Sequence, residues 1–313
     1  MHVIRGTHNC QQHHQNGVLT IGNFDGLHLG HQKMLEQLQS EAERLNTHRC
    51  LMTFEPLPRE FFAKGETTTA RLMNRGEKLR TLAAFKPAIR PELLLFLNFE
   101  QSLASMSAAA FIEEILVKKL KIQSVIIGDD FRFGCDRQGD FKLLQEWGKK
   151  HQFSVISIPS HCLEKQRVSS SLIRDALANN QLTLADKMLG RPYTICGHIS
   201  HGDKRGRTIG FPTANIHLRR SETPLKGVYS VTMHSQQHGD VAGIANLGRR
   251  PTVNGERVQL EVHLFDFDQD IYSEQVCVSF QHKIRDEKKF ESFDDLKNQI
   301  KLDCEKAKQL LTQ

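Results

Sequence analysis

The strongest constraint on the fold is a change of hydrophobic period along the chain. Up to about residue 178, short apolar runs alternate with helical patterns. The apolar runs lie at 18–21, 50–54, 93–97, 124–127 and 154–158, and the helical patterns at 31–45, 76–85, 107–121 and 139–150. Strands that alternate with helices at this spacing predict a parallel sheet covered on both faces. Ligands bind such sheets at the carboxyl ends of the strands, so we expect the chemistry in the loops that follow them.

The second part of the chain follows a different pattern. After a helical connector at about 179–190, residues 193–282 contain short runs with a period of two, separated by Gly, Asn and Pro. This pattern predicts an antiparallel β-barrel or closed sandwich. An amphipathic helix is expected at about 293–311. We therefore predict an α/β protein with domains at 1–184 and 185–313.

Composition restricts the class of partner and the compartment. The net charge of +6 is mild and scattered, and no basic run is interleaved with aromatics, so nucleic-acid binding is not expected. The longest aliphatic runs are strand-sized and the first twenty residues lack a signal-peptide pattern, which predicts a cytoplasmic protein without membrane contact. Seven Cys without a C-x-x-C spacing are expected to be free buried thiols. An oligomer is possible, but no feature indicates one.

The segment GNFDGLHLGH (22–31) lies between the first expected strand and the first expected helix. Its glycines allow a tight turn, and the free N–H groups of the helix start favour phosphate. His28 and His31 can donate hydrogen bonds to phosphate oxygens that carry developing charge. The alternative is that either histidine is an ordinary loop residue or helix cap.

The β-rich part opens with a second Gly-bearing segment, GDKRGR (202–207) followed by GFPTAN (210–215). A basic glycine loop can wrap phosphates, although this one is not a Walker A sequence. Thr213 and Asn215 alternate on an extended segment, so both oxygens face one side and could hold a Mg²⁺–ATP complex. Taken alone, this short pattern is also compatible with a hydrogen-bonded β-turn.

Glu261 lies in the expected strand VQLEVHLFDF. Alternation places its apolar neighbours on one face and Glu261 on the other, with Gln259 and His263. On composition alone, this face would be a solvated strand surface.

The first motif resembles the fingerprint of the H-x-G-H nucleotidyltransferases, and specifically that of bacterial riboflavin kinase/FAD synthetase. Three further segments agree with this family: TFEPLPREFF (53–62), IIGDDFRFGCDRQGD (126–140) and RVSSSLIRDAL (167–177). The second part resembles a riboflavin kinase domain nearly from end to end, through the segments at 190–216, 225–231, 243–253, 260–272 and 284–297. The resemblance implies a Rossmann-like nucleotidyltransferase domain followed by a β-barrel kinase domain.

For the first domain, the resemblance implies an ATP site and a flavin site. The ATP-binding residues would be Gly22, Phe24, Asp25, Gly26, His28, His31, Asp130, Arg167, Ser170 and Arg174. The flavin would contact Glu55, Phe61 and Phe62. Asp130 and Ser171 stand where many relatives carry Asn and Thr, and Ser169 could equally be a helix cap.

For the second domain, the resemblance assigns Glu261 as the general base that takes the proton of the ribityl hydroxyl. ATP would be bound by Gly202, Lys204, Arg207, Gly210, Thr213 and Asn215, with Thr213 and Asn215 as Mg²⁺ ligands. Arg285 would lie in a mobile segment near the flavin. Asn246 would be structural or would support a ligand.

The implied activities are phosphorylation of riboflavin by ATP to FMN and adenylylation of FMN by ATP to FAD. Riboflavin, FMN and ATP are then the partners, FMN and FAD being substrate or product rather than redox cofactors. The alternative is a flavin- or nucleotide-binding regulator that has lost catalysis, but His28, His31, Thr213, Asn215 and Glu261 are all present. The histidine pairs 198/201, 234/238 and 13/14 lack the partners of a zinc site.

Overall fold

The chain forms two compact units. The structure is a computed structural model, and it describes residues 1–63, 69–200, 210–218, 220, 222–252 and 255–312. One unit comprises Met1–Thr69 and Lys78–Ser169, and the other Ala70–Glu77 and Ser170–Gln313. The division runs through helix α3 (Arg75–Ala84). Helices α7 (Ser170–Ala178) and α8 (Leu182–Leu189) belong to the second unit in this division. The predicted domain boundary near residue 185 stays a prediction.

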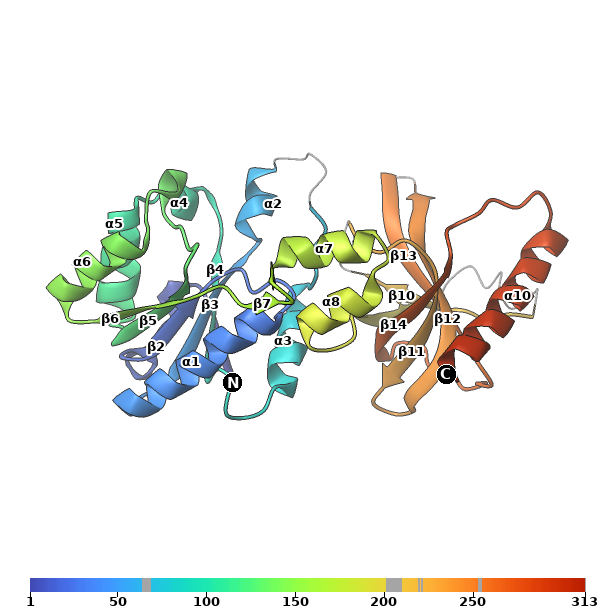
Figure 1. The fold of residues 1–313 in the computed structure, drawn as a ribbon, viewed down its shortest axis with the longest axis horizontal. Coiled ribbons are helices and arrows are strands. Elements are labelled where there is room, and N and C mark those ends of the chain that lie inside the picture. Colours follow the sequence, from blue (N-terminus) through green and yellow to red (C-terminus); the bar gives the residue numbers. More distant parts are fainter. Residues whose placement is uncertain (64–68, 201–209, 219, 221, 253–254, 313) are drawn as a thin grey trace. The chain divides into compact units, whose positions relative to one another are not determined.

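The first unit is built on a parallel sheet of six strands in the order β1-β4-β3-β2-β5-β6 (Figure 1). Its strands are β1 (His2–Arg5), β2 (Val18–Ile21), β3 (Arg49–Glu55), β4 (Leu93–Asn98), β5 (Ser124–Gly128) and β6 (Ser154–Ile158). The five strands expected from the sequence are confirmed. Strand β1 was missed because it has only four residues, of which just one is buried.

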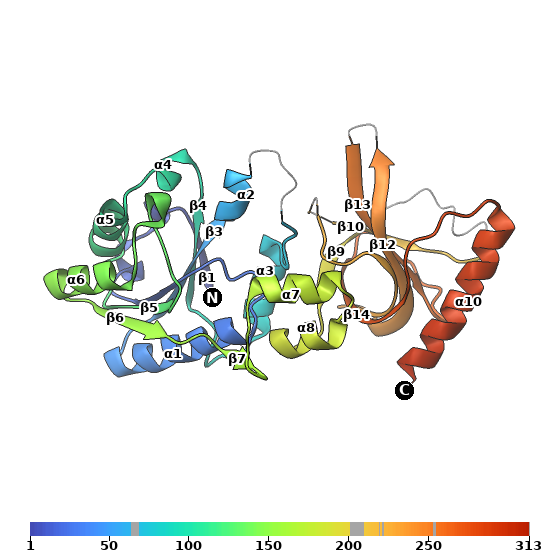
Figure 2. The same cartoon turned by 45° about the horizontal axis from the view of Figure 1, so that its top comes forward.

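Helices cover both faces of this sheet, as its buried strands require. Helix α1 (Leu29–Leu45) packs against β2, β3 and β5. Helix α5 (Ala108–Ala110) continues into the π-helical segment η3 (Phe111–Lys119), which buries four apolar side chains in the core beside Leu19 and Ile21. Figure 2 shows α1 and α5 on opposite sides of the sheet. The remaining elements are η1 (Thr7–Asn9), η2 (Gln12–His14), α2 (Pro58–Phe62), α4 (Gln101–Ala104), η4 (Cys135–Arg137), α6 (Phe141–His151) and the hairpin of β7 (Cys162–Leu163) and β8 (Gln166–Arg167).

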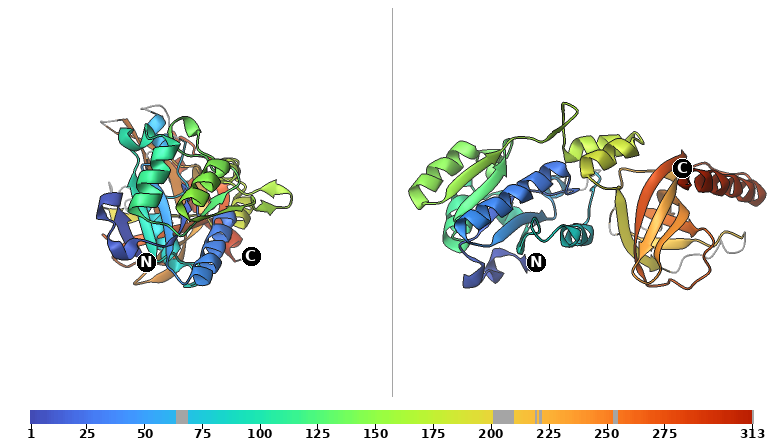
Figure 3. Two further views of the ribbon diagram at one scale, coloured as in Figure 1. Left: turned by 90° about the vertical axis from the view of Figure 1, so that its left-hand side faces the viewer. Right: turned by 60° about the horizontal axis from the view of Figure 1, so that its bottom comes forward.

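The second unit contains a closed antiparallel barrel in the order β10-β13-β12-β11-β14-β9, which confirms the predicted fold class (Figures 2 and 3). Its strands are β9 (Thr194–Ser200), β10 (Ala214–His217), β11 (Gly227–Ser235), β12 (Gly239–Thr252), β13 (Gly255–Leu264) and β14 (Gln275–Arg285). Helices α7 (Ser170–Ala178) and α8 (Leu182–Leu189) precede it and contact each other.

Helix α10 (Phe293–Leu311) covers one side of the barrel. It buries Cys304 and Ala307 against side chains of β11, β12 and β14. Asp303, which is 4% exposed, accepts hydrogen bonds from the guanidinium of Arg285 at the end of β14. The Arg285 side chain is 21% exposed, so this half-buried ion pair links the helix to the end of the strand.

Two of the seven cysteines are joined, which corrects the expectation of free thiols throughout. Cys196 on β9 lies directly opposite Cys277 on β14, and the two form a disulfide across 81 residues of chain. The other five cysteines are free, and burial raises the pKa of Cys50 to about 12. Wide sequence spacing hid the bonded pair, because only the strand register of the barrel brings the two residues together.

We predict that reduction of Cys196–Cys277 destabilises the barrel unit. A disulfide typically contributes about 2–4 kcal/mol, which corresponds to a loss of roughly 5–15 °C in melting temperature for a unit of this size. Thermal melting with and without dithiothreitol measures the effect. The double variant Cys196→Ser/Cys277→Ser should melt at the reduced temperature under both conditions. Seven titratable thiols in the unreduced, denatured protein would contradict the assignment.

Candidate active sites

The loop between β2 and α1 has a strained backbone. The angle φ is +46° at Phe24 and at Leu27 and +92° at Gly26. Phe24 and Leu27 are both fully buried. A non-glycine residue in the left-handed region costs about 1–3 kcal/mol and persists only where its surroundings impose it, which is common at functional sites.

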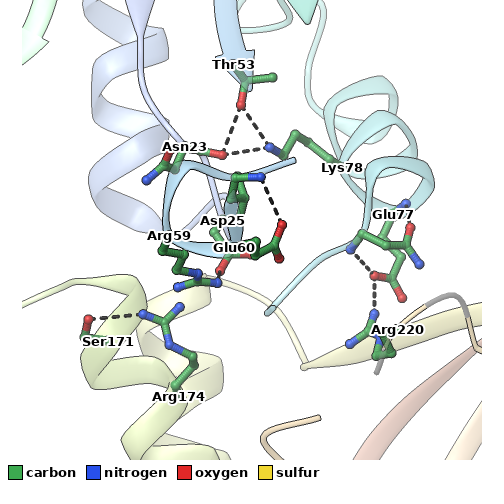
Figure 4. A network of polar contacts seen from close by, with 12 residues as sticks. Asn23, Asp25, Thr53, Arg59, Glu60, Glu77, Lys78, Ser171, Arg174 and Arg220 are labelled. Carbon is green, nitrogen blue, oxygen red and sulfur yellow. Dashed lines mark hydrogen bonds and ion pairs between the residues drawn. The ribbon is translucent and has the colours of Figure 1, made fainter. Parts of the chain in front are cut away.

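Buried polar contacts hold this loop in place (Figure 4). The carbonyl of Asn23 accepts a hydrogen bond from Lys78 Nζ at 2.7 Å and another from Thr53 Oγ1 at 3.1 Å. Asp25, which is 2% exposed, pairs with Arg59 of α2 at 2.7 Å. The sequence placed Asp25 at the ATP site, and here its carboxylate ties the loop to α2.

His28 and His31 lie side by side at the start of α1. His28 is the N-cap residue of this 17-residue helix, and its ring stacks on that of His31 with 3.6 Å between centroids. The ring of Phe24 lies 4.9 Å from that of His31. A side chain at Gly30 would approach the His28 ring to 3.2 Å. Two imidazoles beside the positive end of a helix form a place where an anion is stabilised.

Two acidic residues follow β5 at the same edge of the sheet. Asp130 pairs with Arg167 at 2.5 Å, so the structure brings together two of the predicted ATP residues. Asp129 accepts hydrogen bonds from the hydroxyl and the backbone N–H of Ser160. The hydrogen bond from the Ser160 hydroxyl, with the charge of Arg167, holds the pKa of Asp129 below its usual range.

An aromatic cluster lies where β3 and β4 end. Phe61 and Phe62 on α2 both contact Phe99, at 5.5 and 5.8 Å between centroids, and Phe54 contacts the same ring at 5.7 Å. Phe62 is 59% exposed, which is unusual for a phenylalanine. Phe61 and Phe62 were expected near a flavin, as was the adjacent Glu55. Phe54 was missed because it reads as an ordinary strand residue, and Phe99 because it follows a strand without belonging to any motif.

Ser170 and Arg174 lie on α7, in the second unit. Arg174 donates a hydrogen bond to the hydroxyl of Ser171 at 3.1 Å. We call the loop between β2 and α1, residues 22–28, the histidine loop. The approach of Ser170 and Arg174 to it stays a prediction.

In the barrel, strand register gathers the second set of predicted residues. Asn215 on β10 and Asn246 on β12 are both direct partners of Glu261 on β13. Directly paired residues share one face of a sheet, so the three side chains form a row on the outside of the barrel. The neighbours Leu260 and Val262 are fully buried on the inner face. Gln259 Nε2 bridges the row, donating to Asn215 Oδ1 at 2.7 Å and to Glu261 Oε1 at 2.8 Å.

The last residue of the GFPTAN segment, Asn215, belongs to this row. Thr213 immediately precedes β10, and His263 donates a hydrogen bond through Nδ1 to the carbonyl of Pro212 at 2.8 Å. Gly210 adopts φ = +87°. Gly202, Lys204 and Arg207 lie outside the described residues, so their phosphate contacts stay a prediction.

Arg285 ends β14, where it pairs with Asp303. Its place in a mobile segment near the flavin, which the resemblance implies, stays a prediction. The Arg285 guanidinium lies 5.6 Å from the ring of Phe290. A flavin contact of Arg285 stays a prediction.

The histidine pair 13/14 gains a third imidazole, His2, with ligand atoms within 4.8 Å of one another. The backbone N–H of Gln11 donates to Nδ1 of His14, so a neutral His14 ring carries its proton on Nε2, which lies 3.2 Å from Nδ1 of His2. His2 and His14 are therefore hydrogen-bonded to each other. His234 and His238 bond to separate carboxylates, Asp240 and Glu274.

The first unit has two histidines at a helix start, and the barrel carries a half-buried Asn/Glu row; this combination fits an enzyme that uses nucleotides. Residues 10–172 match the FAD synthetase family and residues 189–311 the riboflavin kinase family. The bifunctional riboflavin kinase/FMN adenylyltransferase of Haemophilus influenzae is 49% identical over 98% of both chains. That of Escherichia coli K12 is 46% identical, over 97% of this chain and 96% of the relative. This chain belongs to the bifunctional riboflavin kinase/FMN adenylyltransferase family.

A solved structure shares the fold along the whole chain. It is that of a Streptococcus pneumoniae protein described as a macrolide-efflux protein, with a TM-score of 0.80, 32% identity and 97% coverage of both chains. Among the described residues, no helix is both long and apolar enough to cross a membrane.

The activities follow from the family. The chain phosphorylates riboflavin to FMN and adenylylates FMN to FAD, with ATP as the donor in both reactions. Nothing favours a regulator without catalysis.

We predict that Gly30→Ala lowers FAD formation without lowering stability. Alanine favours a helix over glycine by about 1 kcal/mol, but its methyl group would press on the His28 ring and disturb the stack with His31. A displacement of this kind should reduce the turnover of FMN to FAD by roughly 10–100-fold. Thermal melting and flavin chromatography on one preparation measure both effects. Unchanged FAD formation in the variant would contradict the prediction and mean that the His28 ring can move aside without loss of activity.

Proposed function

We propose that the histidine loop of the first unit carries out adenylyl transfer and that the Asn215–Glu261–Asn246 row carries out phosphotransfer. The observation that carries the second assignment is the register of β10, β13 and β12, which places the predicted base beside a predicted ATP ligand. The strained, firmly held loop with two stacked imidazoles supports the first assignment.

In phosphotransfer, Glu261 accepts the proton of the riboflavin 5′-hydroxyl while that oxygen attacks the γ-phosphorus of ATP. The new P–O bond forms as the bond to the β-phosphate oxygen breaks, and ADP leaves. Gln259 donates to Oε1 of Glu261, which orients the carboxylate.

The oxygens near this row fit a magnesium ion. Mg²⁺ prefers hard oxygen ligands and binds through a few protein groups together with substrate phosphates. Thr213 and Asn215 would hold it, and Asn215 Oδ1, which accepts a hydrogen bond from Gln259, is an oxygen of the kind that Mg²⁺ prefers. When bound, Mg²⁺ neutralises the charge of the transferring phosphate.

In adenylyl transfer, an oxygen of the FMN phosphate attacks the α-phosphorus of ATP. The bond between the α-phosphorus and the bridging oxygen breaks and pyrophosphate leaves, so no covalent enzyme intermediate is required. His28 and His31 donate hydrogen bonds to the phosphate oxygens as charge develops. Arg167, which Asp130 orients, with Ser170 and Arg174 would bind the remaining phosphate charge.

The aromatic cluster of Phe54, Phe61, Phe62 and Phe99 would receive the isoalloxazine ring of FMN. Aromatic rings favour offset-stacked or edge-to-face contacts, and the exposed Phe62 offers such a surface. We propose that the enzyme acts in the cytoplasm on these small molecules, without nucleic acid or membrane as a partner.

Glu261→Gln should abolish FMN formation while FMN-to-FAD conversion stays near normal. The amide keeps the shape of the side chain but cannot accept the proton, and loss of a general base typically costs about 10²–10⁴-fold. The two rates are measured separately by chromatography of the flavins. Glu305→Gln, an exposed change in the same unit, is the control and should leave both rates unchanged. A near-normal kinase rate in Glu261→Gln would make Glu261 a solvated strand residue.

The double variant His28→Ala/His31→Ala should stop FAD production while FMN accumulates at about the wild-type rate. One donor to a developing oxyanion commonly contributes about 10²–10³-fold to the rate. Because the imidazoles act mainly in the transition state, calorimetric ATP affinity should fall much less than turnover.

The matched control for the two histidines is His8→Ala, an exposed imidazole of the same unit. FAD synthesis that persists in a folded double variant would contradict the assignment of His28 and His31 to adenylyl transfer. Loss of both activities with a large fall in melting temperature would mean that the histidines hold the structure.

A further inference from the structure

Lys78 is a buried cation that lies outside every motif of the adenylyl-transfer site. Its side chain comes from α3 and is 2% exposed. Lysine is almost never fully buried without a partner, because removing its charge from water is costly. Nζ donates to the carbonyl of Asn23 at 2.7 Å and to Oγ1 of Thr53 at 3.0 Å (Figure 4).

The ammonium of Lys78 donates to Asn23, the second residue of the histidine loop. The carbonyl of Asn23 receives both Lys78 and the hydroxyl of Thr53, so both of its lone pairs are used. The next residue, Phe24, has the positive φ, and its buried ring lies against His31. A continuous series of contacts therefore runs from Lys78 through Asn23 and Phe24 to the His31 imidazole.

We propose that Lys78 is a positioning residue for adenylyl transfer. Its ammonium, with the Thr53 hydroxyl, fixes the Asn23 carbonyl and so sets the strained turn that presents His31 and the start of α1 to the ATP phosphates. The inference rests on the proposed function of the histidine loop.

A positioning role differs from general support of the fold in what it affects. The Asn23, Thr53 and Lys78 side chains all belong to the first unit, and the Asn215–Glu261–Asn246 row belongs to the second. Kinase activity of the same chain therefore reports whether a variant is folded and active elsewhere. Lys78 does not touch the reacting atoms in this scheme, so the pH profile of the remaining FAD formation should stay that of the wild type.

The test compares Lys78→Met, Thr53→Val and Thr53→Ser in the full-length enzyme. Lys118→Met, which removes an exposed lysine of the same unit, is the matched control. FMN-to-FAD turnover is measured at varied ATP and pH, and riboflavin phosphorylation and thermal melting are measured on the same preparations. Misplacement of a reacting group by about 1 Å can cost roughly 10²-fold, so Lys78→Met should lower kcat for FAD formation by about that factor.

The companion variants extend the test. Thr53→Val should lower the same kcat by roughly 10-fold, a share of the 10²-fold misplacement cost, and Thr53→Ser, which keeps the hydroxyl, should restore it. Combining Lys78→Met with Thr53→Val should cost less than the product of the two effects, since both act on one carbonyl. FMN formation should stay within about twofold of wild type throughout, as for residues that do not couple to its site.

Three outcomes would overturn the proposal. One is a normal kcat for FAD in folded Lys78→Met or Thr53→Val protein. Another is a shifted pH profile, which would make Lys78 a proton-transfer group. The third is a parallel loss of both activities in Thr53→Val, which would leave Lys78 and Thr53 as core support. A His28/His31 double variant that still makes FAD would instead show that the loop itself was wrongly assigned.

Discussion

Strand β2 is the constraint on which the first unit depends. All four of its residues are buried, and it pairs with β3 on one side and β5 on the other. Its one polar side chain, Thr20, donates a hydrogen bond to the carbonyl of Ile126 on β5, so the chemistry has to begin where the strand ends. The chain must then turn within a few residues to enter α1, and that turn requires the positive φ values at Phe24 and Leu27. The contacts of Lys78, Thr53 and Arg59 follow from the need to hold such a turn.

The barrel positions its side chains by a different means. Glu261, Asn215 and Asn246 lie within regular strands, and the ladder of backbone hydrogen bonds fixes their spacing. No strained backbone is needed at Glu261, because the alternation of a strand already turns it away from the apolar interior. One site is thus held by side-chain contacts to a loop and the other by the sheet itself. We therefore expect substitutions at distant residues to change activity at the loop site more than at the barrel site.

The sequence was sufficient for most of the architecture because periodicity reports burial directly. Five strands of the parallel sheet, the barrel and the terminal helix were predicted, and so was the place of His28 and His31 after a strand. Lys78 was not found, because a single lysine in a helical pattern looks like any surface lysine. The bonded cysteines were missed for a related reason, since only the pairing of β9 with β14 brings them close. The π-helical form of η3 was not predicted, because its apolar pattern is also that of an ordinary α-helix.

Closure of the barrel has a consequence for how the chain associates. In a closed barrel every strand has a neighbour on both sides along part of its length, so fewer unpaired backbone groups are offered to another chain than in an open sheet. The parallel sheet does end in two edges, β1 and β6. Both are short, with four and five residues, and β1 carries the charged Arg5 at its end. Short edges of this kind are a common protection against edge-to-edge aggregation, and in the first unit they stand at both ends of the open sheet.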